Sequence, residues 1–262
     1  MAIVNEPYEY RGLLATTWDL LRGDTSAWDD RPFYRDLILE RGEPALDVGC
    51  GTGRLLLDYL AQGLEVDGVD ISPEMLALCR ERAGRLGLRP TLYEQAMEAL
   101  ALPRRYRTIF VPSSSFQLLT EAAAAREALR RFRAHLSSGG ALVMPFMILW
   151  ERGSPTEHPQ WKLMVERVRP EDGAVVRKWS RARYDVDEQL EHTEDRFEVS
   201  LGGEVIAAEH HVRSPATRWY TQAEVKALYD EAGFVYVHHW SGFTRKPALS
   251  GDTLFVSVGT RP

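Results

Sequence analysis

Three glycines at alternating positions are the most distinctive feature of the sequence. Gly49, Gly51 and Gly53 follow a short apolar run, residues 45–48, that contains one carboxylate, Asp47. Glycine adopts backbone torsions that other residues avoid, and it lets a ligand lie against bare main chain. The residues after the turn have the apolar pattern of a buried helix, whose free N–H groups at its start can bind a carboxylate. Strand, glycine turn and helix together indicate the first half of a βαβ unit.

A second carboxylate stands at the end of the next expected strand. Asp70 follows the turn by about 20 residues, a distance at which an acidic residue can accept hydrogen bonds from both ribose hydroxyls of a nucleoside. Ser72 and Pro73 then have the types favoured at the N-cap and first turn of a helix. Asp67, earlier in the same strand, is expected to be solvated. The glycine turn and Asp70 therefore predict a nucleoside site.

The spacing of the glycines separates two ligand classes. A dinucleotide site requires Gly-x-Gly-x-x-Gly, and Arg54 stands where the third glycine would be. Residues 46–54, Leu-Asp-Val-Gly-Cys-Gly-Thr-Gly-Arg, instead resemble motif I of the class I S-adenosylmethionine-dependent methyltransferases. The resemblance covers the whole chain, but only residues 44–75 carry a specific motif. It implies S-adenosylmethionine as cofactor and S-adenosylhomocysteine as product.

The resemblance also implies which residues bind the cofactor. Gln95 stands where family members commonly have an acidic residue beside adenine, and its amide can still pair with an adenine edge. Aromatic residues of the N-terminal segment fold over the cofactor in the family, although packing against the sheet is the alternative interpretation. The expected cofactor contacts are Tyr10, Tyr34, Asp47, Gly49, Cys50, Gly51, Gly53, Asp70, Ile71, Met75, Gln95, Ala96, Met97, Pro112 and Ser113.

Methyl transfer from a sulfonium is an in-line displacement, which requires an aligned nucleophile and exclusion of water. A general base is needed only when the acceptor is protonated. His211 or Tyr220 is expected to act as base or substrate contact, with a satisfied structural role as the alternative. Phe116, Trp150 and Trp219 are expected to contact the acceptor.

The order of expected elements defines an α/β fold. We expect a doubly wound, seven-stranded, mostly parallel (Rossmann-like) sheet with a small antiparallel β insertion. Residues 1–43 would form an N-terminal helical cap, and residues 44–150 and 214–262 the methyltransferase core. Residues 151–213 alternate in polarity between turn signals. They resemble the β-layer of methyltransferases that act on amino sugars, glycine and related metabolites, where this layer is a substrate lid.

Composition excludes several classes of protein. The net charge of −6 over 262 residues leaves no basic nucleic-acid footprint. The two cysteines, Cys50 and Cys79, indicate no disulfide framework, which favours a reduced cytoplasmic compartment. No signal peptide and no long apolar window is visible, so no membrane association is expected. Adjacent histidines lie in expected strands, where neighbours face opposite sides, so no metal site is expected.

The sequence thus predicts an enzyme that transfers a methyl group from S-adenosylmethionine to an O or N atom of a small molecule. An RNA or protein methyltransferase is one alternative, although the net acidity argues against it. A non-catalytic partner subunit that binds S-adenosylmethionine is another. The identity of the acceptor and the oligomeric state are left open, with a homodimer as one expected assembly.

Overall fold

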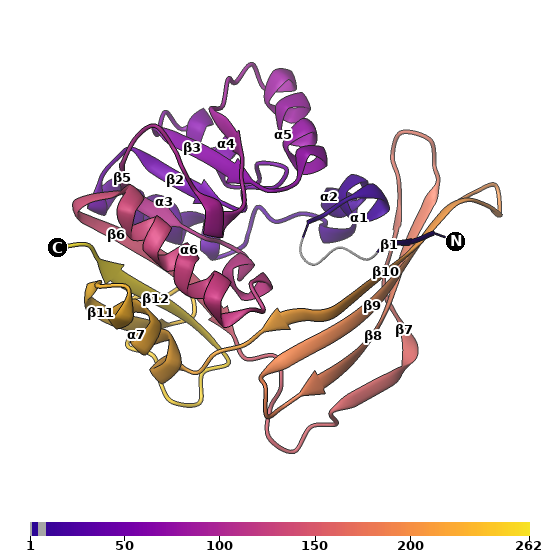
Figure 1. Ribbon diagram of the computed structural model, residues 1–262. Helices are drawn as coiled ribbons and strands as arrows, with labels where there is room; N and C mark the ends of the chain where they lie inside the picture. Colours follow the sequence, from indigo (N-terminus) through magenta and orange to yellow (C-terminus); the bar gives the residue numbers. More distant parts are fainter. Residues whose placement is uncertain (1, 5–8) are drawn as a thin grey trace. The chain divides into compact units, whose positions relative to one another are not determined.

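The computed structural model describes residues 2–4 and 9–262, which form two compact units (Figure 1). The first, here called the layer unit, comprises Met1–Thr25 and Trp150–Arg218. The second, here called the core unit, comprises Ser26–Leu149 and Trp219–Pro262. The N-terminal segment that the sequence groups into one helical cap is therefore shared between the two units.

The core unit contains a seven-stranded sheet with the order β11-β12-β6-β5-β2-β3-β4. Strands β2 to β6 are parallel. Strand β12 pairs antiparallel with β6, and β11 pairs antiparallel with β12. This arrangement confirms the predicted doubly wound fold. The strands are β2 (Ala45–Val48), β3 (Val66–Asp70), β4 (Leu92–Glu94), β5 (Tyr106–Phe110), β6 (Leu136–Met147), β11 (Val235–Ser241) and β12 (Leu254–Thr260).

Helices cover the core sheet. Three helices, α3 (Asp30–Arg41), α4 (Leu56–Ala61) and α5 (Pro73–Arg85), share one hydrophobic cluster with the sheet, which places them on the same face. Two more, α6 (Ala122–His135) and α7 (Gln222–Glu231), contact each other. Short 3-10 turns, η1 (Met97–Ala99) and η2 (Ser115–Leu118), follow β4 and β5.

Local sequence signals explain where two of these helices begin. The Ser72 hydroxyl accepts a hydrogen bond from the Met75 backbone N–H at 3.1 Å, and Pro73 occupies the first helical position of α5. Thr221 and Glu224 form the capping box at the start of α7. Both starts are confirmed as predicted from the sequence.

The layer unit is a twisted five-stranded sheet with the order β1-β10-β9-β8-β7. Its four long strands are antiparallel, as predicted, and the short β1 runs parallel to β10. Leu13, Leu20 and Leu21 of the two N-terminal helices pack on the apolar end of this sheet. The elements are β1 (Ala2–Val4), α1 (Gly12–Thr16), α2 (Trp18–Arg22), β7 (Glu157–Val168), β8 (Val175–Asp185), β9 (Leu190–Leu201) and β10 (Glu204–Arg218).

One carboxylate in the core departs from its prediction. Asp67 is 5% exposed, and its Oδ2 accepts a hydrogen bond from the Tyr106 hydroxyl at 2.9 Å, with Arg104 Nη1 at 3.7 Å. The prediction of a solvated side chain is wrong because β3 lies inside the sheet, between β2 and β4. A buried carboxylate needs such partners to offset its desolvation.

Candidate functional site

The glycine turn after β2 is held by the carboxylate at the end of β3. Gly51 donates its backbone N–H to Asp70 Oδ2 at 2.8 Å, and Ser72 donates its own to Oδ1 at 2.9 Å. Gly49, Gly51 and Gly53 all have positive φ, of 72°, 55° and 81°. A carboxylate has about four lone-pair sites, which allows Asp70 to hold the turn and also to accept hydroxyl groups. The two motifs singled out in the sequence thus form one structure at the carboxyl ends of adjacent strands.

Asp47 lies beneath this turn and is 1% exposed. Its Oδ1 is buried and has no hydrogen-bond partner among the described residues. Burial is the main cause that raises the pKa of the Asp47 carboxyl, to about 8. The negative charge of Asp70 raises it further, whereas the positive charge of Arg54 lowers it. The Asp47 carboxyl thus has the Leu56 backbone N–H as one donor, whereas its Oδ1 is a buried acceptor without a donor among the described residues.

We expect this carboxyl to make the stability of the ligand-free protein fall as pH rises. An unfolded aspartate has a pKa of about 3.9. In the folded protein the pKa of Asp47 is raised to about 8. The stability that protonated Asp47 contributes is therefore fully present below the unfolded pKa and is lost as pH rises through the folded pKa. Relative to Asp47→Asn, the wild type should lose free energy of unfolding across this window, by up to ~1.4 kcal/mol per pH unit. Urea unfolding of both proteins measures this difference, and parallel pH curves would contradict it.

A buried ion pair closes the other end of the turn. Arg54 Nη1 donates to Asp30 Oδ1 at 3.0 Å, and Nη2 donates to Oδ2. The two side chains are 7% and 5% exposed, and the Trp28 ring lies 5.1 Å from the Arg54 guanidinium carbon. The pair ties the start of α3 to the residue that follows the last glycine. Sequence reasoning missed Asp30 because no motif surrounds it.

Gly53 shows why the turn needs glycine at its end. An added Cβ would lie 2.7 Å from Cys79 Sγ and 2.8 Å from Leu57 Cγ. Gly63 has a similar φ of +84°, but nothing lies within 4 Å of its Cβ position. We expect Gly53→Ala to cost ~1–3 kcal/mol more than Gly63→Ala, because both are strained at positive φ and only the first is also crowded. Urea unfolding of the two variants tests this, and equal losses would show that crowding is unimportant.

Tyr34, a predicted cofactor contact, is a core residue. It is 1% exposed, stacks on Phe110 with 5.2 Å between ring centroids, and meets Phe33 and Phe243 edge-on. Burial, and then the nearby Asp30, raise the pKa of its hydroxyl. This geometry favours the packing alternative for Tyr34, and its contact with a cofactor stays a prediction.

The loop after β4 contains the residues expected beside adenine. Gln95 Oε1 accepts a hydrogen bond from the Ala101 backbone N–H at 2.8 Å, so a contact to a base would use its NH2 group. Its own backbone N–H donates to the Asp70 carbonyl at 3.1 Å, which places it beside the end of β3. Ile71 and Ala96 are partly exposed, whereas Cys50, Met75 and Met97 are buried.

The loop after β5 reaches the glycine turn. The Pro112 carbonyl accepts hydrogen bonds from the Ser115 N–H at 3.1 Å and from its hydroxyl at 2.8 Å. Ser115 Oγ lies 3.0 Å from where a Cβ on Gly49 would be. Ser113 and Ser114 both have φ of 56°, in the left-handed region. Such backbone strain clusters at ligand sites, and Ser113 is exposed, as a ligand contact requires.

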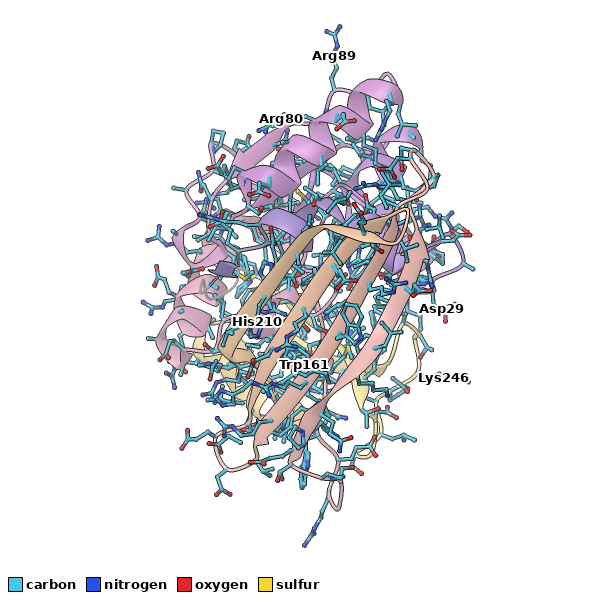
Figure 2. The ribbon with its side chains drawn as sticks, turned by 90° about the vertical axis from the view of Figure 1, so that its right-hand side faces the viewer. Asp29, Arg80, Arg89, Trp161, His210 and Lys246 are labelled. Atoms are coloured by element: carbon cyan, nitrogen blue, oxygen red, sulfur yellow. The ribbon has the colours of Figure 1, made fainter. Side chains whose placement is uncertain are left out.

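His211, the first predicted base, lies on the layer unit. Its Nε2 is 2.8 Å from Glu209 Oε2, which also accepts the Leu13 backbone N–H at 2.7 Å. The ring is 5% exposed and meets Phe197 edge-on. The neighbouring His210 lies on the opposite face of the sheet beside Trp161, with 5.6 Å between ring centroids (Figure 2).

The other predicted catalytic and substrate residues are divided between the units. Tyr220 and Phe116 of the core unit are both buried, with 6.1 Å between their ring centroids. Trp219 is also buried and belongs to the same unit. Trp150 belongs to the layer unit, where its Nε1 donates to the Ser154 carbonyl at 3.1 Å. Tyr10 belongs there too, 4.9 Å from the Trp18 ring.

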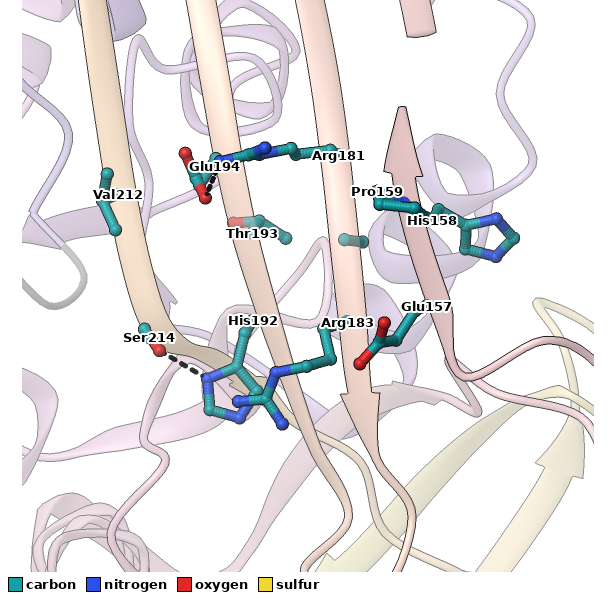
Figure 3. Close-up of a pocket in the computed structure, with 11 residues that line it drawn as sticks. Glu157, His158, Pro159, Arg181, Arg183, His192, Thr193, Glu194, Val212 and Ser214 are labelled. Atoms are coloured by element: carbon teal, nitrogen blue, oxygen red, sulfur yellow. Dashed lines mark hydrogen bonds and ion pairs between the residues drawn. The ribbon is translucent and has the colours of Figure 1, made fainter. Parts of the chain in front are cut away.

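The layer unit also has a cavity of about 270 Å³ that the sequence did not predict (Figure 3). Arg181 pairs with Glu194 at 2.6 Å and His192 Nδ1 lies 2.6 Å from the Ser214 hydroxyl, all four being among its lining residues. Burial first, and then the charge of Arg183, lower the pKa of His192. The cavity wall therefore contains charged groups of both signs beside apolar surface.

Comparison with known proteins agrees with this geometry. Residues 45–140 match the family model of a methyltransferase domain. The ubiquinone biosynthesis O-methyltransferase of Sodalis glossinidius is 33% identical over 112 residues, 40% of this chain and 45% of the relative. The dTDP-3-amino-3,6-dideoxy-alpha-D-glucopyranose N,N-dimethyltransferase of Streptomyces fradiae is 30% identical over 142 residues, 52% of this chain and 54% of the relative.

A solved structure is similar over nearly the whole chain. CalS10 of Micromonospora echinaspora, an amino pentose methyltransferase, matches with a TM-score of 0.65 and 25% identity, over 97% of this chain and 98% of that one. The chain spans about half the length of the curated relatives described above. The resemblance to class I methyltransferases is thus confirmed over residues 45–140, which match a methyltransferase domain and lie within the expected doubly wound fold.

Proposed function

We propose that this protein transfers a methyl group from S-adenosylmethionine to a nitrogen of a small hydroxylated amine such as an amino sugar. The observation that carries the proposal is the Asp70 carboxylate, which bridges the backbone amides of Gly51 and Ser72 at the glycine turn. The turn and Asp70 together offer an acceptor for ribose hydroxyls and bare main chain for the rest of the nucleoside. The methyltransferase family match over residues 45–140 supports this assignment.

The residues around the turn fit the cofactor. Asp47 Oδ1 is a buried acceptor without a donor, and the ammonium of S-adenosylmethionine supplies such a donor, directly or through water. Asp70 would hold the ribose, and the Gln95 amide would contact the adenine edge. When bound, the cofactor supplies a methyl group already activated by its sulfonium. The protein then has to align the acceptor and exclude water.

Nitrogen is favoured over oxygen by two relatives. The Streptomyces fradiae relative is named as an amino-sugar dimethyltransferase, and CalS10 as an amino pentose methyltransferase. The ubiquinone O-methyltransferase is the runner-up and keeps a hydroxyl acceptor as the second candidate. The CalS10 match covers 97% of this chain, whereas the match to the O-methyltransferase covers 40%.

An amine acceptor is protonated near neutral pH, so transfer requires a base. We propose His211 for this role. Its Nε2 faces Glu209, which orients the ring and leaves Nδ1 to take the proton of the acceptor ammonium. Tyr220 remains the alternative predicted from the sequence. We expect His211→Ala to lower kcat and leave S-adenosylmethionine affinity intact, while His210→Ala, on the opposite face, changes neither.

The experiment that tests the proposal measures S-adenosylhomocysteine formation with a panel of amino sugars and their matched hydroxyl analogues. Product with amines that is absent with the matched alcohols supports the proposal. Product with alcohols alone would move the assignment to an O-methyltransferase. Cofactor binding without turnover on either panel would support a non-catalytic binding subunit and overturn the proposal.

Location and assembly stay proposals. Cys50 and Cys79 are both free and buried, which agrees with a reduced cytoplasmic compartment. None of the helices within the described residues is long and apolar enough to cross a membrane. We also propose a homodimer, to be tested by light scattering of the purified protein.

A further inference from the structure

One arginine of the layer unit is buried with most of its donors unused. The Arg213 side chain on β10 is 13% exposed, and neither its Nε nor its Nη1 has a hydrogen-bond partner among the described residues. Its Nη2 lies 3.4 Å from Asp195 Oδ2, a long contact. The Tyr10 ring is also a neighbour: its centre lies 5.7 Å from the guanidinium carbon, and its hydroxyl is a hydrogen-bond partner of the Arg213 side chain. Nε and Nη1 carry three of the five N–H donors of a guanidinium. Leaving them unpaired is costly, so this group is poised to accept a ligand.

A second unused polar group lies on the same face. Thr193 on β9 is directly opposite Arg213 in the register, as Asp195 is opposite His211. Because alternate residues of a strand share a face, these four side chains lie on one side of the sheet. Thr193 Oγ1 is buried and has no hydrogen-bond partner among the described residues. A guanidinium and a hydroxyl thus present donors side by side.

The charges around Arg213 leave room for an anion. Asp195 is shared between two cations, because Lys178 Nζ also lies 3.2 Å from its Oδ2. The Ser180 hydroxyl donates to its other oxygen. A further carboxyl near Arg213 is Glu191, whose pKa is raised by burial, which makes it a weaker counter-charge. Arg213 and the partly exposed Lys178 therefore share the carboxylate of Asp195.

We propose that Arg213 and Thr193 form a subsite for an oxyanion, a carboxylate or phosphate group carried by the methyl acceptor. A guanidinium matches the planar pair of oxygens that both groups offer, and the threonine hydroxyl adds a third donor. That the bound oxyanion belongs to the methyl acceptor rests on the proposed function. Binding of an oxyanion by Arg213 and Thr193 does not rest on it. A purely structural role for Arg213 would leave no site for added anions.

The test uses the full chain and follows the Nε–H resonances of its arginines by NMR. The Arg213 signal is assigned by its absence in Arg213→Lys. Inorganic phosphate and acetate are titrated separately at constant ionic strength, so that the two arms distinguish a phosphate from a carboxylate site. We expect one of the two anions to shift the Arg213 signal in a saturable way. Thr193→Val, which keeps the arginine, should weaken the binding of that anion by at least about threefold.

Arg196→Gln is the matched control. Arg196 lies on the other face of β9, with its guanidinium carbon 4.0 Å from the centre of the Trp161 ring. This variant should bind the anion as the wild type does. A wild-type Arg213 signal that neither anion moves would overturn the subsite, as would equal anion affinity of the wild type and Thr193→Val. Anion binding without methyl transfer to any acceptor would keep the subsite and reject the proposed function instead.

Discussion

Replacing Asp70 by alanine should weaken S-adenosylmethionine binding by about 10- to 150-fold. The variant loses the carboxylate that accepts the N–H groups of Gly51 and Ser72, and with it the proposed ribose contact. Hydrogen bonds to a charged group contribute ~1.5–3 kcal/mol, which corresponds to this range of affinity. Calorimetric titration of the cofactor into wild type and Asp70→Ala measures the change.

A double-mutant-type cycle, which combines Asp70→Ala with a modified ligand, separates the contact of Asp70 with ribose from its role in holding the glycine turn. An S-adenosylhomocysteine analogue that lacks the ribose 2′ hydroxyl should bind the wild type less tightly than S-adenosylhomocysteine does. In Asp70→Ala the two ligands should bind alike, because the acceptor of that hydroxyl is gone. If the analogue loses the same affinity in both proteins, Asp70 shapes the turn without touching ribose. If the wild type binds no S-adenosylmethionine at all, the proposed function should be abandoned.

Replacing Arg54 by methionine should lower the free energy of unfolding by ~3–5 kcal/mol, because the change leaves Asp30 as a buried carboxylate without its partner. Asp30 is 4% exposed and receives both hydrogen bonds of the bidentate pair from Arg54. Arg54 also opposes the raised pKa of Asp47, so its loss removes a favourable charge from two carboxyls. Urea unfolding of the ligand-free protein measures the loss.

Two comparisons show whether burial is the cause. The pair of Arg85 and Glu81 is 69% and 62% exposed, so Arg85→Met should change stability by no more than ~0.5 kcal/mol. The double variant Asp30→Leu with Arg54→Met removes both charges and should recover much of the loss. An Arg54→Met variant as stable as Arg85→Met would mean that the ion pair does not hold the turn. A double variant that is less stable than Arg54→Met would indicate that the loss comes from packing rather than from charge.

Local signals in the sequence were sufficient to predict the fold and the contact between the glycine turn and Asp70. The spacing of Gly49, Gly51 and Gly53 after an apolar strand, and the position of Asp70, define a turn whose residues are close in the chain. Helix caps at Ser72 and Thr221 are equally local, and the structure has both. The alternating strands of the layer unit were also readable from the sequence, because the polarity of a half-buried antiparallel sheet repeats every two residues.

Other parts of the site depend on residues that meet only after folding. Asp30 and Arg54 are 24 positions apart and neither lies in a recognisable pairing pattern. The unpartnered Oδ1 of Asp47 and the burial of Asp67 follow from helices and neighbouring strands that cover the sheet. The same holds for Arg213, which no sequence motif singled out.

The sequence by itself thus determined the class of fold, the glycine turn and the carboxylate that completes it, since backbone torsions and short-range hydrogen bonds carry that information. Only the tertiary structure decided which charges are paired, which are buried without partners, and which face of the β-layer each side chain occupies. Burial and pairing are properties of contacts between distant segments. They set the pKa of Asp47 and leave Nε and Nη1 of Arg213 without partners among the described residues.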